Sequence, residues 1–77
     1  MNSQLIESML LSKDEEVRKL GVLVIKNSFI YPSNIEFILN DIVKYKFEKT
    51  SIQNFIKNLI NYNEEYKRNY FNRIIIL

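Results

Sequence analysis

The feature that most constrains the fold is residues 12–21, which separate two apolar runs and carry a helix-start signal. Ser12 followed three residues later by Glu15 fits a capping box. In this motif the serine oxygen accepts an orphan amide of the first turn, and the glutamate reaches back to the serine amide. One helix should therefore end near Leu11 and the next begin near Lys13. So short a connection predicts an antiparallel helix hairpin.

The same signal occurs twice more, where Ser33 precedes Glu36 and Thr50 precedes Gln53 by three residues. Each pair lies at the edge of an apolar run with helical spacing, so each predicts a helix start. Asn63 is a further candidate cap. The helices expected from caps and periodicity cover residues 3–11, 13–28, 34–46, 51–61 and 64–75.

Two alternatives concern the C-terminal part of the chain. The last two helices either stop and restart around residues 61–63 or run together as one helix. Residues 73–77 are rich in β-branched side chains and suit a short strand, but we prefer a helix because no other segment offers a convincing strand partner. The predicted fold is a single all-α domain over residues 1–77, a compact bundle of four to five short helices arranged as antiparallel hairpins.

The apolar positions of each helix predict the face that turns inward. Gly21 lies within such a face, although a glycine inside a helix costs about 1 kcal/mol relative to alanine. Close approach of a neighbouring helix, where a side chain would clash, is the simplest reason for it. The expected inward positions are Leu5, Ile6, Met9 and Leu10; Val17, Leu20, Gly21 and Val24, with Val22, Leu23 and Ile25 widening this face; Ile35, Ile38, Leu39, Ile42 and Val43; Ile52, Phe55, Ile56, Leu59 and Ile60; and Tyr66, Tyr70, Ile74 and Leu77, with Phe71 and Ile75 beside them.

Composition argues against catalysis. The chain has no cysteine and no histidine, which removes the usual thiolate nucleophile, the usual general base and the commonest zinc ligand. A single glycine leaves no Gly-rich phosphate loop. The acidic run Asp14, Glu15 and Glu16 points in diverging directions on a helix and suits a first helical turn. We therefore expect no enzyme, no metal site and no cofactor.

Residues 3–28 resemble a HEAT-repeat unit. Leu5 and Ile6 on the first helix are followed by an acidic turn, then by Val17-Arg18, and the small residue Gly21 comes three after the arginine. The resemblance is confined to this first hairpin. HEAT proteins are mostly scaffolds for protein contacts, so the resemblance implies a helical hairpin with a binding role.

Surplus apolar residues predict a protein-binding surface, because so small a chain cannot bury all of them in one core. Three of them fall in the expected loop around residue 30, one lies off its helical stripe, and three form the C-terminal tail. The candidate partner-binding residues are Phe29, Ile30, Tyr31, Phe47, Ile75, Ile76 and Leu77.

An alternative function is nucleic-acid binding by the last helix. Lys67, Arg68 and Arg73 are interleaved there with aromatic residues, and such a pattern suits phosphate contacts and base stacking. The net charge of +2 is too small to indicate nucleic acid by itself.

The expected function is thus that of a small non-enzymatic interaction or assembly module, whose partner is another protein or a second copy. The chain has no apolar run of membrane-spanning length and no basic signal-peptide start, so we expect a cytoplasmic protein, with no membrane contact and no small-molecule substrate.

Asn, Ile and Lys supply 30 of 77 residues, which indicates a GC-poor genome. Such a composition suits a phage-encoded accessory protein, either a virion component or a host-factor binder in the host cytoplasm.

Overall fold

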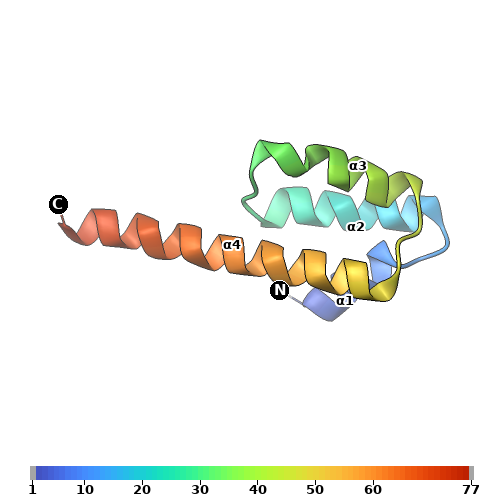
Figure 1. The fold of residues 1–77 in the computed structure, drawn as a ribbon, viewed down its shortest axis with the longest axis horizontal. Helices are drawn as coiled ribbons and strands as arrows, with labels where there is room; N and C mark the ends of the chain where they lie inside the picture. Colours follow the sequence, from blue (N-terminus) through green and yellow to red (C-terminus); the bar gives the residue numbers. More distant parts are fainter. Residues whose placement is uncertain (1, 77) are drawn as a thin grey trace.

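The computed structural model describes residues 2–76, with side chains for residues 2–73, and its regular elements are helices (Figure 1). The all-α fold class is confirmed. Four α-helices and one short 3₁₀ turn follow in the order α1 (Ser3–Leu10), α2 (Glu15–Ser28), η1 (Ser33–Ile35), α3 (Glu36–Lys44) and α4 (Lys49–Ile76).

The first three helices and the first half of α4 form a small body, and the rest of α4 projects from it. α1 contacts both α2 and α4, and α2 and α3 lie side by side (Figure 1). Because α4 continues past the other elements, the molecule measures 48 × 22 × 19 Å along its principal axes.

The core lies inside this body and is made of aliphatic side chains from all four helices. The predicted inward faces of α3 and of the first half of α4 are confirmed, since their central positions are buried. In α1, Leu5 was expected inward but is exposed. The buried hydrophobic residues are Ile6, Leu10, Val22, Ile25, Leu39, Ile42, Ile52, Ile56 and Leu59.

The inward face of α2 is confirmed in part, because Gly21, Val22 and Ile25 of the predicted wide apolar face are buried. Arg18, Val22 and Ile25 are buried, whereas Leu20 and Leu23 are exposed. Arg18 shares this buried face, where its guanidinium is hydrogen-bonded to backbone carbonyls inside the body. A purely apolar criterion could not identify a charged residue as part of the buried face.

Gly21 lies where α1 and α2 approach each other, as the sequence predicted. A Cβ atom at this position would stand 2.9 Å from Leu10 Cδ2 and 3.0 Å from Met9 Cβ, closer than side chains normally approach. The absence of a side chain therefore lets the two helices come together.

All three predicted capping boxes are wrong in detail. α2 begins at Glu15 with Asp14 as its N-cap, and the Asp14 carboxylate accepts the Glu16 amide at 2.9 Å. Ser12 lies two residues before this cap, and its hydroxyl oxygen accepts a hydrogen bond from the Asp14 amide. Ser33 is the first residue of η1 and not a cap, because the N-cap position of η1 is Pro32 and that of α3 is Ile35, and neither carries a side-chain cap. The Glu36 carboxylate bonds Tyr31 and Lys26 instead.

α4 is one continuous helix, so the alternative in which the last two helices run together is confirmed. Thr50 follows the first residue of α4 and is not its N-cap. Asn63 lies inside α4, so the prediction that it caps a new helix is wrong. Its side chain is hydrogen-bonded to the backbone of the loop at Ile30. The backbone is helical through Ile76, which excludes the C-terminal strand for residues 73–76, whereas Leu77 lies outside the described residues.

Candidate interaction surface

The second half of α4 projects from the body, and we call residues 64–76 the arm (Figure 1). Every residue from Glu64 to Arg73 is exposed. Ile52, Ile56 and Leu59 bury the inner face of α4 in the body. Residues spaced by three and four share a helix face, so this face continues along the arm through Tyr66 and Tyr70.

The loop between α2 and η1 is fastened to α4 at the base of the arm. The side-chain oxygen of Asn63 accepts the Ile30 amide at 2.7 Å, and its Nδ2 donates to the Ile30 carbonyl at 2.8 Å. Nδ2 also donates to the Leu59 carbonyl within α4. These bonds satisfy the buried amide of Asn63 and fix the loop beside the arm.

The fixed loop and the arm form a concave surface that we call the aromatic corner. It consists of Ile30 from the loop and Tyr66, Lys67, Tyr70 and Phe71 from the arm, which together line an open hollow of about 480 Å³. The rings of Tyr70 and Phe71 lie edge to face, with centroids 6.2 Å apart, a favourable arrangement for aromatic pairs.

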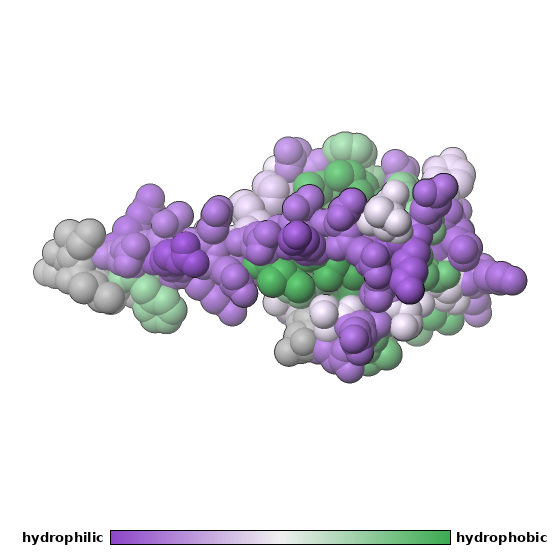
Figure 2. Space-filling model, turned by 60° about the horizontal axis from the view of Figure 1, so that its bottom comes forward, coloured by the Kyte–Doolittle hydropathy of each residue, from purple (hydrophilic) through white to green (hydrophobic). Residues whose placement is uncertain are grey.

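The aromatic residues of the corner are far more exposed than their positions on the core-facing stripe predicted. Tyr66 is 47% exposed, Tyr70 57% and Phe71 59%. Figure 2 shows the arm as a narrow, largely hydrophilic projection with one hydrophobic patch towards its far end. The prediction that Tyr66 and Tyr70 pack inward is wrong, because the body ends before it reaches them.

The three basic residues of the arm do not share one face. Successive helix residues are turned by about 100°, so Lys67, Arg68 and Arg73 point to three different sides of the arm. Only Lys67 lines the aromatic corner.

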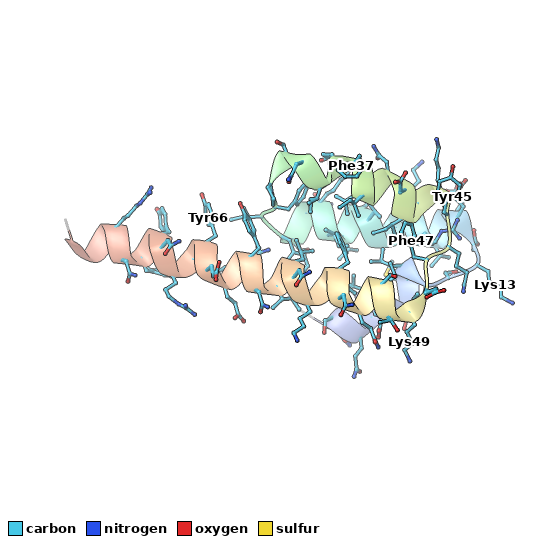
Figure 3. All side chains as sticks on the ribbon, in the orientation of Figure 1. Lys13, Phe37, Tyr45, Phe47, Lys49 and Tyr66 are labelled. Carbon is cyan, nitrogen blue, oxygen red and sulfur yellow. The ribbon has the colours of Figure 1, made fainter. Side chains whose placement is uncertain are left out.

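The predicted partner-binding residues are distributed over the two ends of the body. Ile30 is exposed in the corner, and Phe29 and Tyr31 beside it are half-buried against the core. Phe47 is also half-buried against the core and lies at the opposite end of the body from Tyr66 (Figure 3). Ile75, Ile76 and Leu77 fall outside the side chains that the structure describes.

A polar cluster ties the loop to α2 and α3 on the body side of the corner. The Tyr31 hydroxyl donates to Glu36 Oε1 at 2.7 Å, and Lys26 Nζ lies 3.4 Å from Glu36 Oε2. The hydrogen bond lowers the pKa of Glu36, helped by Lys26 and opposed by partial desolvation, and it raises the pKa of Tyr31.

Acidic side chains among residues 2–76 do not gather into a group of three that could hold a metal ion. None of the helices described combines the length and apolar character that crossing a bilayer requires.

Comparison with known proteins gives no relative from which a function could be transferred. No family model matches the chain, and no match was found among curated proteins or solved structures.

Proposed function

We propose that this chain is a small interaction module that binds a protein partner through the aromatic corner. One observation carries the proposal: the face of α4 that forms the core continues uncovered along the arm, where Tyr66, Tyr70 and Phe71 are about half exposed. Clustered exposed aromatic residues are typical of protein-binding surfaces, where they supply much of the binding energy.

The fastened loop supports the same proposal. Asn63 holds Ile30 against the base of the arm through two hydrogen bonds, so the corner is formed before any partner arrives. A preformed surface binds more tightly than a flexible one, because less conformational entropy is lost on association.

A HEAT-like character of the first hairpin belongs to this proposal. The arginine and the glycine on which the resemblance rests both have contacts that suit a packed helix pair: Arg18 bonds backbone carbonyls, and Gly21 lies against α1. In this interpretation α1 and α2 form a rigid platform that presents the loop and the arm. A phage-encoded accessory protein remains our interpretation of the composition.

The proposal can be tested by photo-crosslinking in cells. A photoreactive phenylalanine analogue in place of Phe71 should form a discrete protein adduct, whereas the same analogue in place of Phe37 should not. Phe37 is a matched control, because it is 63% exposed but lies on α3. Equal adducts at both positions, or no protein adduct at Phe71, would contradict the proposal.

Binding of single-stranded nucleic acid is a second candidate function, favoured by Lys67, which lies among three aromatic rings of the corner. A cation beside rings suits phosphate contact and base stacking. The divergent directions of Arg68 and Arg73 make it the weaker candidate. It predicts a nuclease-sensitive adduct at Phe71 and an oligonucleotide affinity that falls steeply with salt and with Lys67→Ala.

A further inference from the structure

We infer that the groove between α2 and α3 binds an acidic amphipathic helix of a partner protein. The groove shares no residue with the aromatic corner, so the inference does not rest on the proposed function. Three observations carry it: the apolar floor of the groove, the lysines on its rim, and the form of its walls.

The floor of the groove is apolar. Val22 and Leu23 of α2 and Val43 of α3 line this open hollow, whose volume is about 420 Å³. Leu23 is 45% exposed, although helical periodicity predicted it to face the core. A partner that covers the floor removes this apolar surface from water, which favours binding. The contacting face of the partner should therefore be apolar.

Lysines form the rim of the groove, and no carboxylate of the described residues lines it. The rim residues are Lys19, Lys26 and Lys44. Arg18 donates to the Val43 carbonyl, so the start of α2 lies beside the end of α3. Lys19 and Lys44 therefore lie at the same end of the groove, whereas Lys26 lies at the other end beside Glu36. The positive rim is complementary to an acidic partner.

Two of the rim lysines are without an ionic partner among residues 2–73. Lys19 and Lys44 form no ion pair with the carboxylates that the structure describes there. The acids closest to them in sequence are Glu15, Glu16 and Asp41, which lie about one helical turn away and do not line the groove. Like charges on opposite walls repel each other, and a carboxylate between them is attracted by both. The apolar face of the partner should therefore be flanked by Asp or Glu.

The walls of the groove favour a helix as its occupant. They consist of side chains from two neighbouring helices, whose backbone groups are bonded within each helix. An extended segment would find no backbone partners there, whereas a helix satisfies its own backbone groups. The groove follows α3, which is nine residues or about 13 Å long, enough for roughly two turns of a bound helix. A flat bilayer would rest on the lysine rim without reaching the floor.

A displayed library of helical peptides can test the chemistry of the occupant. The library is selected on the chain that carries Tyr66→Gln/Tyr70→Gln, so that the aromatic corner does not capture its members. The selected peptides should be enriched in Asp and Glu beside leucine, isoleucine or phenylalanine at helical spacing, and their affinity should fall as salt rises. Selected peptides without an excess of acidic residues would overturn the inference.

The position of the site can be tested with matched charge reversals. Lys19→Glu/Lys44→Glu should weaken the binding of a selected peptide at least about tenfold, because two attractions become repulsions. Lys49→Glu/Lys57→Glu makes the same change in net charge on α4 and should bind the peptide as the wild type does. Equal weakening by both reversals would show unspecific attraction and overturn the inference.

Leu23→Gln tests the groove independently of its charges. It should weaken peptide binding with unchanged helix content, because it removes exposed apolar surface from the floor and glutamine is a good helix former. Binding that is unaffected by this change would contradict a contact with the floor.

Other occupants of the groove give different results. Phosphatidylserine vesicles that bind the wild type but not Lys19→Glu/Lys44→Glu, without any peptide that depends on the groove, would assign the rim to a lipid surface. A dimer that dissociates on the same change would assign the groove to a second copy. Either result overturns the inference. Phe37 does not line the groove and remains a control for Phe71, so a missing adduct at Phe71 contradicts the proposed function alone.

Discussion

Arg18 joins two parts of the chain that are distant in sequence. Its Nη1 donates to the carbonyls of Ser12 and Lys13, and its Nε and Nη2 donate to those of Ile42 and Val43. One buried guanidinium thus satisfies carbonyl groups at the α1–α2 connection and at the end of α3. Helix ends leave such carbonyls without partners inside the helix, so Arg18 fastens the end of α3 to the start of α2.

Arg18→Met should lower the free energy of unfolding by roughly 3 kcal/mol, because hydrogen bonds to a charged group are lost and buried carbonyls are left unsatisfied. Arg18→Lys keeps the charge but lacks the planar guanidinium, so it should lower the free energy of unfolding by somewhat less than Arg18→Met does. Lys19→Met, at the exposed neighbouring position, is the control and should stay within about 0.5 kcal/mol. Urea unfolding measures all three, and a neutral Arg18→Met would contradict the structural role.

Gly21→Leu should destabilise the fold by roughly 1–3 kcal/mol through overpacking. The new side chain would meet Leu10 and Met9 of α1, which already stand within 3.0 Å of the position of a Cβ atom. Leu20→Ala is the matched control, since Leu20 looks like a core residue in the sequence but is exposed. In denaturant melts, a larger loss of unfolding free energy for Leu20→Ala than for Gly21→Leu would contradict the close contact of α1 with Gly21.

Asn63→Leu should weaken the attachment of the loop to α4. The substitution leaves the Ile30 amide and carbonyl without their partners, which should cost about 1–3 kcal/mol. Hydrogen exchange measures the effect most directly, because the Ile30 amide should exchange faster in the variant. Asn61→Leu, an exposed position in the same helix, should leave that amide as protected as in the wild-type chain.

At the scale of elements, periodicity predicted the helices well and their ends poorly. All segments expected to be helical are helical because their apolar positions recur at helical spacing. The ends depend on single hydrogen bonds and on where the 3₁₀ turn lies: Asp14 replaces Ser12 as cap, and Ser33 lies inside η1 while Glu36 bonds Tyr31 and Lys26. The Asp14 cap is itself local, two residues beyond Ser12, whereas Lys26 reaches Glu36 from another helix, which a local motif does not contain.

The candidate surface was predictable only in part for a related reason. The exposed loop residue Ile30 and the basic and aromatic residues of the arm were singled out from the sequence as separate surfaces. The structure brings them together through Asn63, whose polar side chain gave only a capping signal. Tyr66 and Tyr70 follow the core periodicity without interruption, so nothing in the pattern marks where the body ends and the arm begins.

The hydrogen bond between Tyr31 of the α2–η1 loop and Glu36 of α3 makes the stability of the fold depend on pH. The pKa of Glu36 is lowered in the folded chain from its ordinary value of 4.5, chiefly by the Tyr31 hydroxyl and further by Lys26. A lowered folded-state pKa stabilises the fold above the unfolded pKa, and that stabilisation is lost as pH falls through the folded pKa. Glu36→Gln should therefore be less stable than the wild type at pH 7.

The difference in unfolding free energy between the wild type and Glu36→Gln should shrink as pH falls below about 4.5, the ordinary pKa of Glu36. At still lower pH both chains carry a neutral group at position 36, so urea unfolding at pH 7, 5, 4 and 3 should show the two curves converging. Glu64→Gln, an exposed acid on the arm, controls for the general effect of removing a negative charge. A gap that widens on acidification would contradict the role given to Tyr31 and Lys26.

At the scale of the whole molecule, stability and association should be linked. The core is confined to the body, and a chain of 77 residues lies close to the lower size for an independent fold. Residues 64–73 of the arm add exposed aromatic surface and take no part in that core. The groove between α2 and α3 is part of the body instead, so a partner bound there stabilises the folded chain by mass action.

The midpoint of thermal unfolding should therefore rise with the concentration of a peptide that binds the groove. Well above the dissociation constant, each tenfold increase in peptide should add about 1.4 kcal/mol to the free energy of unfolding. For a domain of this size that corresponds to about 6–11 °C. Calorimetry should show this shift for the wild type and for Lys49→Glu/Lys57→Glu, but not for Lys19→Glu/Lys44→Glu. A midpoint independent of peptide concentration in all three would mean that the body alone sets the stability of the molecule and that the groove takes no part in association.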